Sequence, residues 1–317
     1  MASDFLSVIT SLLYRDLKKR SAYLLAAFIS LFYVLALFPM NFLMGKAAFF
    51  QSGDIAQHIS GWLAYAADVW RWPLLFTNRI NYPDGVSVAF TDSIPLLAIF
   101  LKPFVQFLPS NFHYFGIWQG FSFFLQGIAS VFLMRALGVR HVLSLIAALV
   151  FSLTWPSLMW RTAHTSLMAH WLILTALGIY FCGQSRRFSF HEATVYFFML
   201  CVLALLIHPY FIPFCFLIFL AFLIDISLKE GGLVVNLGWA MALGILIVGL
   251  GWGLGYLGGN IADGGYDQFS LNLASPFCGG YVTPCFMDAT GGQGEGFNYF
   301  GVGFIFLVVI GLCPQQG

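Results

Sequence analysis

Long apolar stretches separated by short polar loops are the feature that most constrains this chain. A membrane-spanning helix needs about 20 apolar residues, and only 9% of the side chains here are charged, against about a quarter in soluble domains. The sequence therefore predicts an all-α polytopic membrane protein, a helical bundle of about eight spans. The apolar windows lie at 22–44, 113–136, 142–159, 166–183, 193–208, 210–227, 233–256 and 297–313.

The charge balance argues against a nucleic-acid partner, and two of the cysteines leave a disulfide open. The net charge is +1, and the segment RDLKKR is the one basic cluster. Nucleic-acid binding requires a concentrated basic face, so we expect no nucleic-acid partner. Cys278 and Cys285 lie in a loop rich in Gly and Pro, where they either form a short disulfide or stay unpaired.

A shorter apolar run at 93–109 decides the orientation of everything after it. Lys102 and three prolines interrupt this run, so we expect it to lie at the membrane interface rather than to cross. On that topology nine basic residues fall on the cytoplasmic side, as the positive-inside rule favours. They are Arg15, Lys18, Lys19, Arg20, Arg135, Arg140, Arg186, Arg187 and Lys229.

This topology divides the chain into a cytoplasmic segment at 1–21 and a transmembrane domain at 22–317. Its outer loops are expected at 45–112 and 257–296. Most of the remaining ionisable side chains then fall outside, so the chemistry is expected on the outer face. The last apolar window is short and is followed by little else, which predicts either a C-terminally truncated chain or a short final helix.

The segment GDIAQHISGWLAYAADVW, starting at Gly53, predicts an amphipathic helix at the membrane surface. Asp54, His58 and Asp68 fall on one stripe of this helix. Asp54 is either only the N-cap of the helix or also a functional carboxylate. A carboxylate and an imidazole on one face can abstract a proton or hold a divalent ion, and Gln57 and His58 beside Asp54 favour a functional site.

Polar residues near three other span ends are further candidates. Asp92 precedes an apolar helix, where it either caps that helix or faces the same substrate as Asp54. Arg161 and His164 are three residues apart between two spans, and a guanidinium there either binds phosphate or extends to water. His208 precedes a proline, as a turn residue or a pocket residue.

The segment GGQGEGFNYFGVG at 291–303 leads from the second outer loop into the last apolar window. It lacks the GK[ST] ending of a phosphate-binding P-loop. Its Glu295, Asn298 and Tyr299 are of the types that hold sugars and lipid head groups in a wet pocket. We therefore expect these three residues to bind substrate.

These motifs, in this order, resemble the bacterial GT-C-type polytopic glycosyltransferases, and within them a branch classed only as a domain of unknown function. The resemblance rests on GD and QH after the first span, DSIPLLA, R-x-x-H, IHPY and EGFNYFGVG, and it covers residues 22–313. It implies two juxtamembrane helices in the first outer loop and an acidic residue just after the first span, which matches Asp54. It also implies transfer of a sugar from a polyprenyl-phosphate donor, usually with inversion.

The expected enzyme is thus a glycosyltransferase of the bacterial inner membrane that modifies an envelope glycan, lipid or protein at the periplasmic side. Asp54, assisted by His58, is the expected base. Arg161 and His164 are expected to stabilise the departing phosphate. Asp92 would orient the acceptor or, with Asp54, bind a divalent cation such as Mg or Mn. The alternatives are a lipid or sugar transporter and a non-catalytic membrane scaffold.

Overall fold

The computed structural model describes residues 15–46, 53–155, 158–159, 161–257, 275–277, 299 and 301–312. The chain forms two compact units. The first comprises residues 1–153 and 161–259, and the second comprises residues 154–160 and 260–317. Every part of the candidate site described below belongs to the first unit.

Six helices of the first unit are long and apolar enough to cross a membrane, so the chain is an integral membrane protein. One of these spans, Thr165–Gln184, consists of a short 3-10 turn, η3 (Thr165–Met168), followed by helix α9 (Trp171–Gln184). Each of the other five spans is a single α-helix. The other five are α2 (Lys19–Leu37), α6 (Phe115–Ala136), α10 (Phe190–Ile207), α11 (Phe211–Glu230) and α12 (Leu233–Leu254).

Two of the eight predicted spans are shorter than the sequence windows suggest. Helix α7 (Val142–Leu153) has 12 residues and α13 (Val302–Leu312), in the second unit, has 11. The sequence explains the early end of α7, because Pro156 follows closely and disfavours helical backbone before it. The described part of the chain therefore supports six full-length spans, and the predicted count of about eight is not reached there by length.

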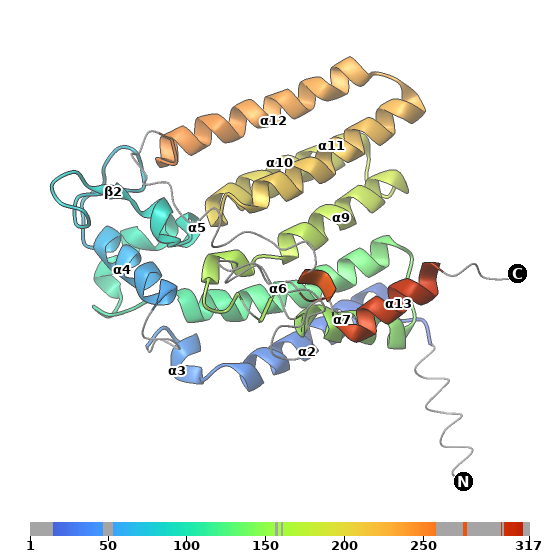
Figure 1. Cartoon of the computed structure of the whole chain (residues 1–317), viewed down its shortest axis with the longest axis horizontal. Helices are drawn as coiled ribbons and strands as arrows, with labels where there is room; N and C mark the ends of the chain where they lie inside the picture. The colour runs from blue at the N-terminus through green and yellow to red at the C-terminus, as the bar shows by residue number, and fades with distance from the viewer. Residues whose placement is uncertain are drawn as a thin grey trace, which may run out of the picture. The chain divides into compact units, whose positions relative to one another are not determined.

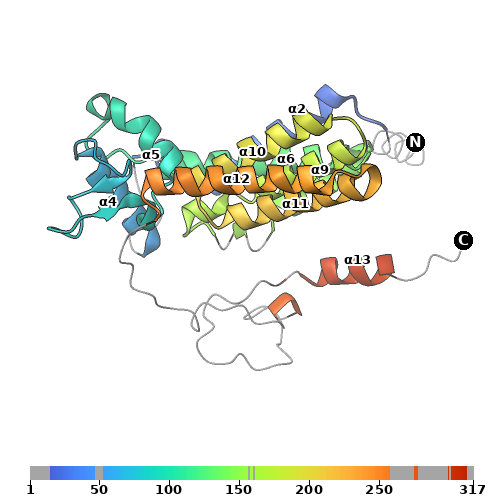
Figure 2. The ribbon, with the colours of Figure 1, turned by 90° about the horizontal axis from the view of Figure 1, so that it is seen from above.

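Helix α6 lies at the centre of the bundle. It packs against α2, α7 and α9, while α11 contacts α9, α10 and α12. Glycines allow the closest approaches: a Cβ at Gly127 would lie 1.9 Å from Ser30 Oγ, and one at Gly178 would lie 2.3 Å from the Phe132 ring. The six long helices run side by side in both views (Figure 1, Figure 2).

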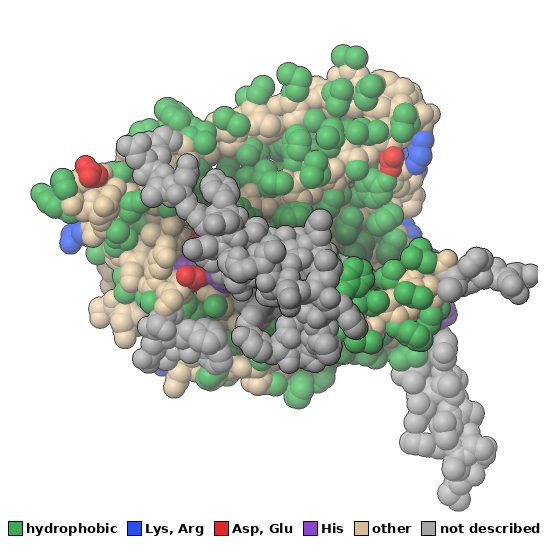
Figure 3. All heavy atoms as spheres, in the orientation of Figure 1, with side chains coloured by type: hydrophobic (Ala, Val, Ile, Leu, Met, Phe, Trp, Pro, Cys, Tyr) green, Lys and Arg blue, Asp and Glu red, His purple; other side chains and the backbone are tan. Residues whose placement is uncertain are grey.

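The outward flank of the bundle is apolar, as a lipid-facing surface must be. Figure 3 shows hydrophobic side chains covering α10, α11 and α12, with charged side chains near the helix ends. Ile245, Val248 and Trp252 of α12 are each at least 60% exposed. This distribution places the hydrocarbon layer along the long helices and the polar chemistry at their ends.

The segment between α2 and α6 folds over one end of the bundle (Figure 1). It contains α3 (Met40–Leu43), α4 (Asp54–Ala66), the antiparallel strands β1 (Phe76–Thr77) and β2 (Val86–Ser87), η1 (Val88–Thr91), α5 (Pro95–Leu101) and η2 (Lys102–Phe107). The run at 93–109 forms the short broken helix α5–η2, as its prolines predict. Phe100, Phe104 and Phe107 are exposed on it, as side chains at a membrane interface commonly are.

The predicted cytoplasmic basic residues lie at the opposite end of the bundle. Arg135, at the end of α6, donates to the Leu17 carbonyl at 3.1 Å, and Arg187, after α9, donates to the Arg135 carbonyl at 2.6 Å. Arg186 pairs with Glu230 at the end of α11. The segment before α2 and the ends of α6, α9 and α11 therefore meet at one face.

Candidate active site

Five of the residues predicted from sequence lie together at the end of the bundle covered by α4 and α5. Asp54 and His58 come from α4, and Asp92 from the link between η1 and α5. His164 immediately precedes η3, and His208 ends α10. The cluster thus unites four segments that span more than 150 residues of the sequence, with close carboxylate–imidazole contacts between them.

Asp92 lies between two imidazoles. His208 Nε2 is 3.1 Å from Asp92 Oδ1, and His58 Nε2 is 3.7 Å from Asp92 Oδ2. The backbone N–H of Tyr210 donates to His208 Nδ1 at 3.2 Å, so the ring proton of neutral His208 is on Nε2 and points at the carboxylate. His58 Nδ1 lies 2.8 Å from Thr165 Oγ1, and when this hydroxyl donates, the ring proton of neutral His58 is on Nε2, the nitrogen that faces Asp92.

Asp54 forms the second carboxylate–imidazole pair of the cluster. Its Oδ2 lies 2.6 Å from His164 Nδ1. The side chains of Asp54 and His164 are 44% and 22% exposed, whereas that of His58 is 1% exposed. The cluster therefore has a closed side around His58 and an open side at the Asp54–His164 pair, which a substrate can reach.

The backbone around Asp92 is strained and firmly held. Asp92 and Ile94 both have left-handed backbone, with φ of 53° and 47°, a conformation that costs energy for residues with a side chain. Ser93 Oγ donates to the His58 carbonyl at 3.0 Å, and Tyr114 Oη donates to the Ser93 carbonyl. These bonds compensate for the strain and fix the direction of the Asp92 carboxylate.

Gly61 allows α4 to approach this strained segment. A Cβ at Gly61 would lie 2.0 Å from Thr91 Oγ1 and 2.5 Å from Ser93 Oγ, far inside van der Waals contact. Any side chain here would separate α4 from residues 91–93. The glycine one turn after His58 therefore determines how close His58 comes to Asp92.

Burial and charge act in opposite directions on the cluster. Burial lowers the pKa of His58 to about 4, although the Asp92 and Asp54 carboxylates favour its charged form. Burial raises the pKa of Asp92, but the hydrogen bond from His208 and the neighbouring imidazoles outweigh burial and leave this pKa below its ordinary value. At neutral pH the buried part is thus a neutral His58 beside an ionised Asp92.

Three local predictions are corrected by this geometry. Asp54 is not the N-cap, because Gly53 takes that position with φ of 71°, and no side chain caps the helix. Asp92 does not cap α5 either, since Ile94 holds the N-cap position. The stripe of α4 that carries His58 is buried in the protein and does not face water at a membrane surface, because it packs on residues 91–93.

Gln57 and Arg161 lie beside the cluster. Gln57 is exposed, and its Nε2 donates to the Phe90 carbonyl at 3.4 Å, which ties α4 to η1. Arg161 is half-buried in the same turn as His164, whose N–H donates to the Arg161 carbonyl at 3.0 Å. This turn also brings His164 to Asp54, with 2.6 Å between His164 Nδ1 and Asp54 Oδ2.

The second outer loop adds little to the described site. Glu295 and Asn298, like Cys278 and Cys285, lie outside the described residues. Tyr299 is half-buried and belongs to the second unit. Among the described residues, no group of three or more His, Cys, Asp and Glu side chains is arranged to hold a metal ion. Binding of Mg or Mn by Asp54 and Asp92 stays a prediction.

Sequence reasoning missed the residues that hold the loop between Arg161 and α9. Trp118 Nε1 donates to the Thr165 carbonyl at 2.8 Å, and Gln119 Nε2 donates to the Thr162 carbonyl at 2.7 Å. Both donors are buried in α6. The sequence did hold a clue to these bonds: Trp118 and Gln119 lie at the start of an apolar helix, and such polar groups need hydrogen-bond partners when they are buried.

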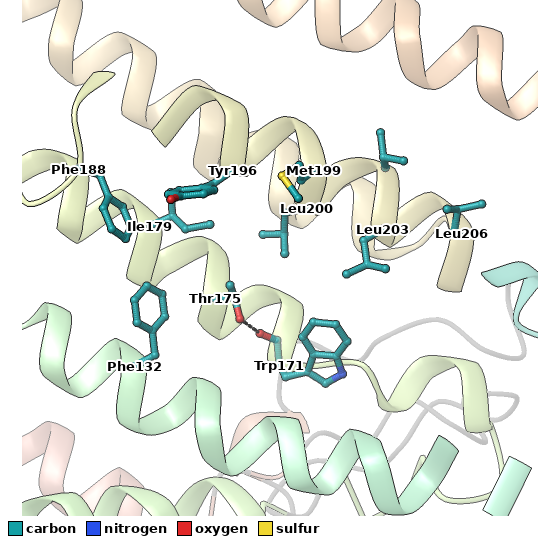
Figure 4. A pocket seen from close by; sticks show the side chains of 11 residues that line it. Phe132, Trp171, Thr175, Ile179, Phe188, Tyr196, Met199, Leu200, Leu203 and Leu206 are labelled. Carbon is teal, nitrogen blue, oxygen red and sulfur yellow. Dashed lines mark hydrogen bonds between the residues drawn. The ribbon is translucent and has the colours of Figure 1, made fainter. Parts of the chain in front are cut away.

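An apolar groove begins near the cluster and runs along the membrane-spanning helices. It has a volume of about 620 Å³ and lies between α6, α9 and α10. Figure 4 shows Trp171 and Leu206 at one end and Phe188 and Tyr196 at the other. Trp171 follows His170 at the start of α9, and its buried Nε1 has no hydrogen-bond partner among the described residues.

One family model matches residues 27–316, nearly the whole chain. The chain belongs to the family described as Domain of unknown function (DUF6311). No curated protein matches it, and no solved structure does. The family description names no activity.

Proposed function

We propose that this DUF6311 protein is a membrane glycosyltransferase that takes a sugar from a polyprenyl-phosphate donor and transfers it, with inversion, to an envelope acceptor. The observation that carries the proposal is the cluster of two carboxylates and three imidazoles at one end of the apolar bundle. Such a cluster supplies groups for proton transfer and for neutralising a phosphate. Its position at the helix ends suits a substrate whose lipid lies in the membrane.

Asp54 is the group best placed to act as the general base. One of its carboxylate oxygens accepts a hydrogen bond from the ring N–H of His164, and the Asp54 side chain is more exposed than that of His164. The other oxygen can take the proton of an acceptor hydroxyl as that hydroxyl attacks the anomeric carbon. The bond from this carbon to the phosphate oxygen breaks, and the polyprenyl phosphate leaves with both bonding electrons.

His58 has a positioning role in this mechanism rather than the assisting role expected from sequence. It is buried, and its two ring nitrogens face Thr165 and Asp92. It therefore holds the Asp92 carboxylate in place and fixes the spacing between α4 and residues 91–93. Asp92, which is partly exposed, is available to orient the acceptor.

The leaving phosphate also requires stabilisation. A general base accelerates a reaction about 10²–10⁴-fold. Further acceleration requires groups that stabilise the negative charge developing on the leaving phosphate. Arg161 and His164 share the turn at the open side of the cluster. We assign the phosphate to these two side chains, because a guanidinium binds phosphate through two parallel N–H groups.

The apolar groove supports a donor that carries a hydrocarbon chain. Its lining is formed by the membrane-spanning helices α6, α9 and α10, and one end lies where α9 begins and α10 ends, beside His208 (Figure 4). A polyprenyl chain in this groove would place its phosphate near the cluster. The Trp171 N–H is available to a polar atom at that end.

The distribution of cations supports an outward-facing site. The cluster lies at the start of α6, and the basic residues of the loops gather at the end of α6. The basic side is cytoplasmic by the positive-inside rule. We therefore assign the cluster to the periplasmic or other extracytoplasmic side of the bacterial plasma membrane.

The decisive variant is Asp54→Asn. The purified protein in detergent is supplied with a panel of synthetic polyprenyl-phosphate monosaccharides, and release of polyprenyl phosphate is followed by mass spectrometry. Removing the base should lower the rate of polyprenyl-phosphate release about 10²–10⁴-fold. Asp84→Asn is the matched control, because Asp84 is exposed in the turn before β2; it should keep the wild-type rate. A fully active Asp54→Asn protein would remove Asp54 from the mechanism.

The alternative is a lipid or sugar transporter without transferase chemistry. Transporters place their ionisable groups near the membrane midplane, often on broken helices. The cluster here comes from helix ends and from the segment over them, which favours the transferase. If the wild-type protein moves the same donors across vesicle membranes and consumes none of them, the transporter is correct.

A further inference from the structure

A basic cavity lies at the opposite end of the bundle from the candidate active site. It has a volume of about 490 Å³. Its wall is formed by the segment before α2, the end of α6 with the loop that follows, and the loop after α9. The lining side chains are Asp16, Leu17, Lys18, Lys19, Arg135, Arg140 and Arg187.

The cavity concentrates positive charge that the chain as a whole lacks. Five Lys and Arg residues line it, against one acidic residue, in a protein whose net charge is +1. The one acid, Asp16, is paired with His141 at 3.2 Å. The field inside the cavity is therefore that of a cluster of cations, and an anion is the ligand it favours.

Two of the five cations are tied to the protein and three face the cavity without such ties. Arg135 donates to the Leu17 carbonyl, and Arg187 donates to the Arg135 carbonyl. These bonds fix the shape of the wall. In the described part of the chain, Lys18, Lys19 and Arg140 have no side-chain hydrogen bond or ion pair, so their charges are available to a ligand.

The start of α2 adds backbone donors to the same cavity. The helix begins at Lys19 with no side-chain cap and no acidic residue in its first turn. The first N–H groups of a helix have no intrahelical acceptor and carry a partial positive charge. With the cations around it, this helix end forms an anion-binding site of the kind that phosphate groups occupy.

The position of the cavity identifies the source of the anion. Helices α2, α6 and α9 each belong to a span long enough to cross the membrane, and each has one terminus at the cavity: the start of α2 and the ends of α6 and α9. The cavity therefore lies at the level of the lipid head groups, on the side that carries the excess of Lys and Arg. Basic pockets between spans on that side bind anionic head groups. We propose that the cavity binds the phosphate of an anionic membrane lipid.

The test compares two triple variants that remove the same charge from the same membrane face. The first is Lys18→Gln, Lys19→Gln and Arg140→Gln, within the cavity. The control is Arg20→Gln, Arg186→Gln and Lys229→Gln, outside the cavity lining. Each purified full-length protein is titrated with phosphatidylglycerol in phosphatidylcholine nanodiscs, and bound anionic lipid is counted by native mass spectrometry.

Wild type should retain phosphatidylglycerol saturably, and the cavity variant should bind it about 100-fold more weakly, because each basic residue near an anionic surface contributes about fivefold. The control should stay within about threefold of wild type. Equal losses in both variants would overturn the proposal, since general surface attraction would then explain binding. Single variants Lys19→Gln and Arg140→Gln, each expected to weaken binding about fivefold, replace the triple variant if it does not fold.

A second arm separates a lipid from a soluble phosphate. Inorganic phosphate and glycerol 3-phosphate are added at millimolar concentration to the wild-type protein loaded with phosphatidylglycerol. The lipid should stay bound, because its acyl chains remain in the membrane. Displacement of the lipid by either soluble phosphate would show that the cavity recognises a free anion instead, and the lipid assignment would be wrong.

Discussion

The two ends of helix α6 show two different ways of using polar residues in a membrane protein. Near its start, Trp118 and Gln119 are buried and bind the loop that carries His164 and Thr165. About 25 Å further along, by the rise of 1.5 Å per residue, Arg135 lies at the edge of an open basic cavity. At the first end the polar side chains are buried and hydrogen-bonded, and at the second end Lys and Arg side chains present their charge to a cavity.

This difference is the one expected if both proposals are correct. Transfer of a sugar would require carboxylates and imidazoles placed to within a fraction of an ångström, and burial with hydrogen bonding supplies that precision. A head-group phosphate requires only a favourable potential, which flexible lysines supply. Single substitutions should therefore lower the free energy of unfolding strongly at the cluster and only slightly at the basic end.

The largest effect is expected for Gly61→Ala. The new methyl group would overlap Thr91 Oγ1 and Ser93 Oγ, so residues 91–93 would have to move away from α4. We expect a loss of about 3 kcal/mol in stability and loss of donor consumption, because Asp92 would leave His58. Thermal unfolding in detergent and the donor assay measure both. The control is Gly244→Ala in α12, where nothing lies within 4 Å of the added carbon; equal behaviour of the two variants would contradict this account.

Lowering the pH should destabilise the cluster through His58. Its folded-state pKa of about 4 lies below the ordinary value of 6.5, so the unfolded chain binds the proton more tightly. The contribution of neutral His58 to the free energy of unfolding is fully present above pH 6.5 and is lost as the pH falls towards 4. Between pH 7.5 and 5 the loss should be about 2 kcal/mol.

The matched control for this pH dependence is His58→Gln, which has no titrating group at this position. Its stability should be lower than that of wild type at pH 7.5, but it should fall by less between pH 7.5 and 5. If the two proteins lose the same stability over this interval, His58 is not the titrating group.

A smaller effect is expected for Thr165→Val. This change keeps the shape of the side chain and removes the hydroxyl 2.8 Å from His58 Nδ1. The lost bond should cost about 1 kcal/mol and lower the donor rate, since the orientation of His58 is relaxed. Thr194→Val is the control, because that hydroxyl donates to the Phe190 carbonyl of its own helix; it should leave the donor rate unchanged. If Thr194→Val lowers the donor rate and Thr165→Val does not, the positioning role of His58 is contradicted.

The sequence predicts well the helices and the separation of the candidate residues from the basic residues, because both depend on local composition. Hydropathy locates six spans, and the excess of Lys and Arg correctly groups Arg135 and Arg187 with the start of α2. The prolines of the run at 93–109 predict its short broken helix. The count of about eight stays a prediction, because α7, with 12 residues, is shorter than its apolar window.

Pairings within the site could not be predicted, because they depend on backbone that only the folded chain imposes. Asp92 looks like a helix cap in sequence, yet its left-handed φ of 53° turns the carboxylate toward His208. Asp54 is displaced from the cap position by Gly53 and meets His164. Thr165 carried no signal of its own, since its role arises only when η3 packs on α4.

The smallest effect is expected at the basic end, for Arg186→Gln. Arg186 pairs with Glu230, but the two side chains are 70% and 42% exposed, so water screens most of their attraction. Such surface pairs contribute less than about 1 kcal/mol, and we expect thermal unfolding to change by less than about 0.5 kcal/mol with an unchanged donor rate. A loss comparable to that of Gly61→Ala would mean that the basic end is locked as rigidly as the cluster, and the contrast between the two ends of the bundle would be wrong.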